Sequence, residues 1–261
     1  MVNYNPFILH GANCLHQFSY ILNNDIDLDL PKDKPVLIKV NMLRPDDGKK
    51  SITTDVKVAE VLVKHFKDKG YEVIVGDGGE SCFDTLQTFA MNGYVDMCNN
   101  YNVKLVDLNK SPIELKIIGG IQMFISKIAL ESSVISVAKI KPHSMFQVTG
   151  TLKNLMGCVL PKGHMHDNFT NKIIDVYNYI KPVYGVIDGI VANGKCENIS
   201  CPIKLDTIIC SKSLVTLDKI ESYILNRKAD HIETLANIEK VSIDTEKVEK
   251  IKSLYDNGGV Y

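Results

Sequence analysis

The chain lacks tryptophan, and its 261 residues include only seven cysteines. An odd number of cysteines cannot pair completely within one chain, and their frequency is well below the roughly 8–10% of disulfide-stabilised domains. We therefore predict a reducing, cytoplasmic compartment. The sequence has no Cys-x-x-Cys pair and no cysteine run of the ferredoxin type, so we expect no iron–sulfur cluster.

Strong charge of one sign and long apolar runs are also missing. The 30 Lys and Arg residues nearly balance the 31 Asp and Glu residues, which leaves a formal net charge of −1. Because there is no global positive field and no basic stripe interleaved with aromatics, we expect no nucleic-acid partner. No uncharged apolar run approaches the ~18–20 residues that span a bilayer, and residues 1–17 show no secretory pattern, so we expect no membrane partner.

The sequence does contain an alternation of two hydrophobic periods. The β-rich runs Val36–Val40 and Tyr71–Val75 flank a segment, beginning near Asp55, in which apolar residues recur at helical spacing. Strand, helix and strand in this order predict a βαβ unit with parallel strands. Further strands are predicted at Val103–Leu108, Val134–Ile140, Val183–Ile187 and Leu205–Cys210. Further helices are predicted at Asp84–Asn92, Leu152–Val159, Asn171–Ile180 and Leu214–Asn226.

These elements predict a single α/β domain over residues 1–261, with a mostly parallel sheet flanked by helices and with irregular insertions. Ile113–Ile128 has no clear period, and we interpret it as short strands of an inserted layer. Residues 227–261 are rich in Glu and Lys and predict a helical, solvated appendage to a core at about 35–226. No repeat or flexible linker marks a second domain.

Polar residues that are unusual for buried strands follow several of the predicted strands. These residues are Lys39, Asn41, Gly76, Asp77, Asp107, Lys139, Lys141, His143, Asp188, Gly189 and Ser211. In an open parallel sheet, ligands bind at the carboxyl ends of the strands. The general polarity of loops explains part of this set of residues. It does not explain as well why lysines stand at the ends of buried strands.

The turn Gly76-Asp-Gly-Gly-Glu80 follows the second predicted strand. Glycines there permit close backbone approach, and the free N–H groups of a following helix start would bind a phosphate or carboxylate. The spacing matches neither a P-loop nor a dinucleotide fingerprint, and a tight turn without a ligand is an equal alternative. Asp77 and Glu80 would repel an anion unless a lysine or a metal intervened.

Two lysine-bearing segments point more strongly to an anion. Lys139 and Lys141 share a face if their strand persists, and Pro142 would then turn His143 into the strand-end crevice. Structural roles for a Pro-His turn are common, and the neighbouring lysines favour a functional one.

The second segment is Thr149-Gly-Thr-Leu-Lys-Asn-Leu-Met-Gly157. Thr149 or Thr151 would cap a helix whose first turn holds Lys153 and Asn154, so that N–H groups, a hydroxyl and an ammonium converge on one anion. A lysine in a first turn opposes the helix dipole, and local rules are broken most often at functional sites. The alternative is an exposed lysine on an ordinary helix.

The run His164-Met-His166-Asp167 places three metal-ligand types within four residues. Alternate histidines on an extended segment can hold one metal ion, and Asp167 would be a ligand or would orient a histidine. A third ligand must come from elsewhere in the fold. Solvated loop histidines are the commoner alternative, as is an acid–base role for one of the two.

Together these segments resemble the DUF362 family, a group named for its unknown function. The resemblance covers roughly residues 35–226. The segments that carry it are Ile38-Lys-Val-Asn-Met-Leu43, Thr53-Thr54, Gly76-Asp77, Lys139-Ile-Lys-Pro-His143, Thr149–Gly157, a following histidine, and Asp188-Gly-Ile190.

The chain departs from the family pattern at several positions. Val40 replaces a proline, Pro142 replaces a threonine, and a Ser-Asp-Pro element reads Ser211-Lys-Ser-Leu, although Asp218 stands where a later aspartate falls. Many relatives continue into a ferredoxin-like module with cysteine-ligated clusters, which these 261 residues lack. The resemblance therefore implies a site but no electron-transfer role and no reaction.

Our main hypothesis is an enzyme that binds a small anionic metabolite, a carboxylate or a phosphate, with histidine acid–base chemistry. The anion would be held by Lys39, Lys141 and Lys153. The site would be completed by Asn41, Thr54, Gly76, Asp77, Asn154 and Asp188. Proton exchange would involve His143, His166 and a lysine such as Lys141, whose pKa its neighbours would depress.

Two other hypotheses remain open at this point. The first is a hydrolytic or redox protein that binds a divalent metal through His143, His164 and His166 with Asp77 or Asp188. The second is a non-catalytic accessory or binding subunit. An oligomer is compatible with all three hypotheses, and the cofactor, if any, is not identified by the sequence.

Overall fold

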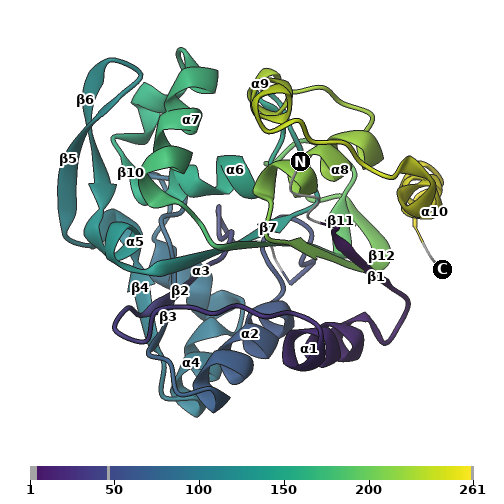
Figure 1. Ribbon diagram of the computed structural model, residues 1–261, viewed down its shortest axis with the longest axis horizontal. Coiled ribbons are helices and arrows are strands. Elements are labelled where there is room, and N and C mark those ends of the chain that lie inside the picture. The colour runs from purple at the N-terminus through teal and green to yellow at the C-terminus, as the bar shows by residue number, and fades with distance from the viewer. Residues whose placement is uncertain (1–4, 46–47, 260–261) are drawn as a thin grey trace.

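The computed structural model describes residues 5–45 and 48–259, and its centre is a seven-stranded sheet in the order β1-β12-β11-β7-β2-β3-β4 (Figure 1). Its strands are β1 (Phe7–His10), β2 (Val36–Lys39), β3 (Val73–Asp77), β4 (Lys104–Asp107), β7 (Ser133–Lys139), β11 (Tyr184–Asn193) and β12 (Pro202–Ser211). The pairs from β11 to β4 are parallel, whereas β12 is antiparallel to both β11 and β1. The predicted α/β fold with a mostly parallel sheet is confirmed.

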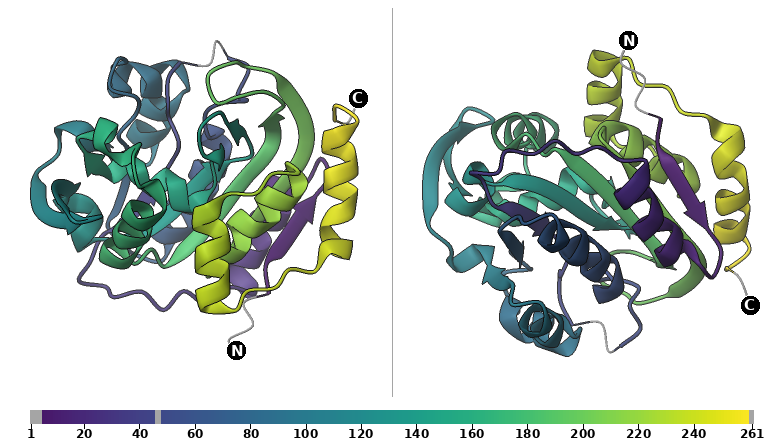
Figure 2. Two further views of the ribbon diagram at one scale, coloured as in Figure 1. Left: turned by 90° about the horizontal axis from the view of Figure 1, so that it is seen from above. Right: turned by 60° about the horizontal axis from the view of Figure 1, so that its bottom comes forward.

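Helices cover both faces of this sheet (Figure 2). One face carries α1 (Cys14–Asn24), α2 (Val56–Asp68), α3 (Thr85–Met91) and α4 (Tyr94–Asn100). The other carries α6 (Thr151–Asn154), α7 (Phe169–Ile180) and α8 (Leu214–Ile224). In β2, Val36 and Ile38 point into the first core and Leu37 into the second, which is why the strand reads as continuously apolar. Among the described residues, no helix has the length and apolarity that a membrane crossing requires.

The segment Ile113–Ile128 forms the inserted layer that the sequence predicts. The strands β5 (Ile113–Ile118) and β6 (Ile121–Ser126) form a hairpin, and β10 (Val159–Leu160) pairs with β6 in a three-stranded sheet. The short helix α5 (Lys127–Glu131) follows, and a small two-stranded ribbon joins β8 (Pro142–His143) to β9 (Gln147–Val148).

The C-terminal segment is helical, as predicted, with α9 (Asp230–Glu239) and α10 (Thr245–Asp256). Its last two residues, 260 and 261, lie outside the described residues. One face of each helix is buried in the core beside α8, through Ile232 and Leu235 in α9 and through Val248 and Ile251 in α10. The segment is thus solvated on one side only, and it covers part of the sheet.

Several predicted elements differ from the structure. β1, α1 and α4 were not predicted. β1 has only four residues, whereas α1 buries Cys14, Phe18, Ile21 and Leu22 at helical spacing, a signal that the prediction missed. The predicted helix Leu152–Val159 is wrong beyond Asn154, where the chain continues as the 3-10 helix η2 (Leu155–Cys158) and enters β10. Ser211 was predicted at the strand ends that form the crevice. Because β12 is antiparallel to β11, Ser211 instead pairs with Gly185, near the amino end of β11.

A buried ion pair joins the carboxyl end of β7 to the middle of β11. Lys139 at the end of β7 lies 2.8 Å from the carboxylate of Asp188 in β11, and both side chains are fully buried. Asp188 also accepts hydrogen bonds from the backbone N–H groups of Asp55 and Ile190, so it connects the start of α2 to the sheet. The Asp188 carboxylate thus accepts three hydrogen bonds, one of them from Lys139, and the opposite charges make the burial of the pair tolerable.

We expect Lys139→Met to lower the free energy of unfolding by about 3–5 kcal/mol, because it leaves the Asp188 carboxylate buried without its cation. The matched control is Lys252→Met, which removes the partner of Asp256 in a partly exposed helical pair and should change stability by less than about 0.5 kcal/mol. Urea denaturation followed by circular dichroism measures both values. A loss below 1 kcal/mol for Lys139→Met would contradict the prediction.

Candidate active-site pocket

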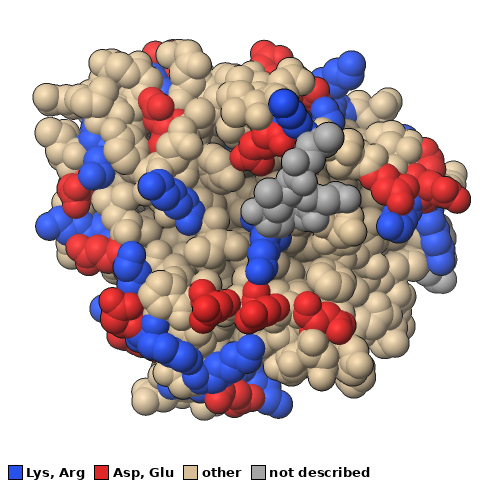
Figure 3. All heavy atoms as spheres, viewed as in Figure 1, with Lys and Arg blue, Asp and Glu red and all other residues tan. Residues whose placement is uncertain are grey.

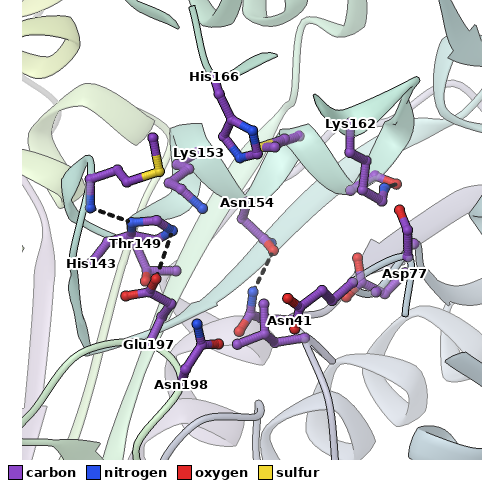
Figure 4. Close-up of a pocket in the computed structure, with 18 of the residues that line it drawn as sticks. Asn41, Asp77, His143, Thr149, Lys153, Asn154, Lys162, His166, Glu197 and Asn198 are labelled. Atoms are coloured by element: carbon purple, nitrogen blue, oxygen red, sulfur yellow. Dashed lines mark hydrogen bonds and ion pairs between the residues drawn. The ribbon is translucent and has the colours of Figure 1, made fainter. Parts of the chain in front are cut away.

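A cavity of about 520 Å3 opens at the carboxyl edge of the parallel strands, where β2 and β3 end (Figure 4). The structure brings these sequence-predicted residues to its wall: Lys39, Asn41, Asp77, His143, Lys153, Asn154 and His166. They come from segments more than 100 residues apart in the chain, as strand-end placement requires. Lys141, Thr54, Gly76, Asp188 and His164 do not line it.

The floor of the cavity is an ion pair between the ends of β2 and β3. Lys39 Nζ lies 2.6 Å from Asp77 Oδ1, and it donates to Asn154 Oδ1 at 2.7 Å and to the Val40 carbonyl at 3.0 Å. Lys39 thus makes two hydrogen bonds and one ion pair, so its charge is compensated within the protein. Lys39 therefore supports the site and is not the free anion ligand that the sequence predicted.

Asn154 and Asn41 extend this network across the floor. The Asn154 amide donates to the Lys39 carbonyl at 3.1 Å and to Ser136 Oγ at 3.1 Å, which fixes its oxygen toward Lys39. Asn41 Oδ1 accepts a hydrogen bond from Lys141 Nζ at 2.7 Å, and Lys141 also donates to the Ile52 carbonyl. Lys141 is buried behind Asn41, so its influence on a ligand passes through that amide, and the prediction of direct catalysis by Lys141 is revised.

The Asp218 carboxylate, in α8, caps the N-terminus of α6. Asp218 accepts hydrogen bonds from the Thr151 N–H at 2.5 Å, from the Leu152 N–H at 2.8 Å and from the Thr151 hydroxyl at 2.6 Å. Burial raises the pKa of Asp218 to about 7 against these hydrogen bonds, which favour the charged form. The expectation that these N–H groups bind an external anion is therefore wrong, because an internal carboxylate already satisfies them.

Two lysines reach the cavity without an ion-pair partner among the described residues: Lys153 of α6 and Lys162 of the 3-10 helix η3 (Lys162–Met165). Burial lowers the pKa of each to about 8; Glu197 opposes the shift at Lys153, Asp77 opposes it at Lys162, and Lys39 adds to both. Lys162 was not predicted from the sequence. The only feature that could have indicated it is its position five residues after Gly157, the end of the lysine-bearing segment.

His143 is held as a neutral donor. Its Nδ1 accepts hydrogen bonds from the backbone N–H groups of Met145 and Phe146, at 3.2 and 3.3 Å, so the ring proton must reside on Nε2. Burial, with Lys153, Lys141 and His166 adding to it, lowers the pKa of His143 to about 2. His143 is therefore suited to donate a hydrogen bond from Nε2.

Glu197 faces this histidine from the loop between β11 and β12, with Oε1 at 3.7 Å from His143 Nε2. It accepts hydrogen bonds from the Ser144 N–H at 2.8 Å and the Ser144 hydroxyl at 2.7 Å. Burial would raise the pKa of Glu197, but these hydrogen bonds and Lys153 outweigh it and lower the pKa overall. No sequence signal identified Glu197, because its loop reaches the site only through tertiary folding.

The histidine run does not assemble a metal centre. His166 lines the cavity and stacks on Phe146 with ring centroids 5.8 Å apart, whereas His164 is exposed away from it. Asp167 pairs with Lys172 at 2.9 Å. Within residues 5–45 and 48–259, no group of three or more His, Cys, Asp or Glu side chains is arranged to hold a metal ion, so the predicted sites at His164 and His166 and at Asp77 or Asp188 have no geometric support.

The remaining predicted residues lie behind the cavity wall. Thr54 accepts a hydrogen bond from the Asn41 N–H at 3.0 Å and donates to the Val137 carbonyl at 3.1 Å. Gly76 lies within β3, where a side chain would meet the Val106 carbonyl at 3.2 Å. In the turn that follows, Gly78 and Gly79 reach the cavity, but the Gly79 N–H donates to Thr85, so that group is not free for an anion.

Two comparisons with known proteins bear on these residues. A family model described as "Domain of unknown function (DUF362)" matches residues 36–222. The chain is also similar to a protein of Synechocystis sp. that is named as thylakoid-associated, with 24% identity over 226 residues that cover 82% of this chain and 70% of that protein. The family match runs from β2 into α8 and includes the ends of β2 and β3, Lys153, Lys162 and Asp218.

Gly157 is required where η2 crosses the floor of the cavity. A Cβ atom there would lie 2.4 Å from Asp77 Oδ1 and 2.6 Å from Lys39 Nζ. We expect Gly157→Ala to force this ion pair apart and to lower the free energy of unfolding by about 1–3 kcal/mol. At Gly163, also on the cavity wall, a Cβ atom would meet nothing within 4 Å, so Gly163→Ala is the matched control and should be close to neutral. Equal thermal stabilities for the two variants would contradict the prediction.

Proposed function

The chain belongs to the DUF362 family, and we propose from its cavity that it is an enzyme that binds a small metabolite bearing a carboxylate or a phosphate. The main observation in support of an anionic ligand is that Lys153 and Lys162 share one cavity. Neither ammonium group has an ion-pair partner among the described residues. Each charge-assisted contact to an anion would contribute roughly 1.5–3 kcal/mol. Acidic and basic side chains are interspersed on the face in Figure 3, so local lysines rather than a surface field would select the ligand charge.

The proposed chemistry is acid–base catalysis on the bound anion. His143 would donate a hydrogen bond from Nε2, and His166 at the cavity wall would exchange protons with solvent. Lys153 would stay protonated in the complex, where its ammonium holds the anion, so it would not serve as the base. Lys39 and Lys141 would hold Asp77, Asn154 and Asn41 in place and would not contact the ligand directly.

We retain a cytoplasmic location as part of this proposal, because a reducing compartment suits seven unpaired thiols. The Synechocystis relative is named for a membrane system, which raises the alternative of attachment to a membrane surface. Cell fractionation of the tagged protein distinguishes the two locations.

The binding proposal is tested with Lys153→Met and Lys162→Met. We expect each variant to weaken binding by at least tenfold, because each loses one charge-assisted contact worth more than about 1.4 kcal/mol. The probes are inorganic phosphate and a set of mono-, di- and tricarboxylates, first screened by thermal shift and then titrated by calorimetry. Lys64→Met, on the exposed side of α2, is the control that should bind as the wild type does. Unchanged affinity in both pocket variants, or no anion that stabilises the wild type, would refute the proposal.

The pH dependence of binding follows from the same lysines. A bound anion stabilises the ammonium form, so the pKa of Lys153 and of Lys162 should rise from about 8 when the ligand binds. Affinity should therefore be greatest below about pH 7 and should fall through pH 8–9, with proton uptake on binding near pH 8. Calorimetry in buffers of different ionisation enthalpy measures this uptake. Affinity that increases from pH 7 to pH 9 would contradict the assignment.

A further inference from the structure

The outer strand of the small sheet exposes an apolar face at the rim of the molecule. In the order β10-β6-β5, β5 is an edge strand, and it lies at the outer side of the fold in Figure 1. The side chains of Ile113, Leu115 and Ile117 are 40%, 48% and 52% exposed, and Phe124, opposite Leu115 on β6, is 37% exposed. Proteins usually protect such an edge, so this one is a candidate for pairing with another strand.

The hairpin turn determines which backbone groups of β5 are available. Gly119 and Gly120 both have positive φ, at +58° and +81°, as a two-residue type I′ turn requires, and Ile118 lies opposite Ile121. In the antiparallel pattern, Ile118, Lys116 and Glu114 then bond to β6, whereas the alternate residues direct their N–H and C=O groups outward.

The outward-facing residues are therefore Ile113, Leu115 and Ile117. The Tyr179 hydroxyl, on α7, donates to the Ile117 carbonyl at 3.2 Å, which agrees with that direction. A carbonyl has two lone pairs, so this contact leaves one for a further donor. Among the described residues, no strand pairs with this edge of β5.

The five residues Ile113-Glu-Leu-Lys-Ile117 are complementary to themselves when read in the opposite direction. In an antiparallel pair centred on Leu115, the outward-facing backbone groups of Ile113 meet those of Ile117 in the second copy, and Leu115 meets Leu115. On the other face, Glu114 of each copy lies opposite Lys116 of the other. The register that matches the backbone groups thus also aligns opposite charges.

We propose that β5 pairs with β5 of a second copy of this chain about a two-fold axis at Leu115, so that the two small sheets become one continuous sheet. The apolar residues of β5 and Phe124 from each copy then form one row across the interface. Within one chain, Glu114 and Lys116 already pair with each other at 2.5 Å, and in the dimer each would gain a partner across the interface. None of these interface residues lines the cavity, and the interface does not depend on the proposed function.

Charge reversal tests both the register and the partner. Glu114→Lys places Lys opposite Lys116 twice per dimer, and Lys116→Glu places Glu opposite Glu114 twice, so each should weaken the homodimer about tenfold or more. The double variant Glu114→Lys/Lys116→Glu restores opposite charges and should dimerise as the wild type does. An equimolar mixture of the two single variants should form a heterodimer, which native mass spectrometry resolves from the homodimers.

Two controls separate this edge from general surface hydrophobicity. Leu115→Arg places like charges on the two-fold axis and should give a monomer, whereas Ile238→Lys on α9, at a side chain 67% exposed, should remain dimeric. Circular dichroism verifies the fold of every variant. A wild-type protein that sediments as a monomer at about 0.1 mM, or single variants that fail to form a heterodimer, would overturn the proposal. Binding of a monomeric wild type to anionic lipid vesicles would also overturn it and would assign the patch to a membrane surface.

Discussion

The ion pair between Lys39 and Asp77 is the interaction on which the cavity depends. It joins the ends of β2 and β3, and through Asn154 it fixes α6 against both strands. Because Lys39 Nζ has three acceptors around it, the central positive charge is neutralised inside the protein. The charge that a ligand would meet therefore comes from Lys153 and Lys162, which the network positions but does not neutralise.

The same division explains how a nearly neutral chain can place two lysines without an ion-pair partner in its cavity. Lys139 and Lys141, like Lys39, stand at strand ends, yet their ammonium groups are used within the fold by Asp188 and Asn41. Buried lysines that are satisfied in this way stabilise the arrangement of strands, whereas partly satisfied lysines have lowered pKa values and remain available for chemistry. Counting charges along the sequence cannot separate the two groups, because the difference lies in which acceptors the fold places around each nitrogen.

Much of the fold could be predicted because β2 and β7 are buried on both faces and read as continuous apolar runs. β1 was not predicted because four residues are too few to show a hydrophobic period, and its position at the sheet edge follows only from its pairing with β12. In the site, position at the end of a strand predicted that Asp77 and His143 lie together, and the expected helix start added Lys153; all three line the cavity. It failed for Lys141 and Asp188, since strand position does not reveal which neighbour a long or buried side chain meets. Lys162 and Glu197 lie on turns whose approach to the cavity depends on tertiary packing alone.

The cap on α6 has a consequence for how the protein is made. Lys39 and Asp77 leave the ribosome early, but Asp218, whose carboxylate closes the start of the helix that carries Lys153, belongs to the last fifth of the chain. A nascent chain that stops before α8 contains every cavity lysine and lacks the group that orders Lys153. The start of α6 therefore cannot reach its final structure before α8 has been synthesised.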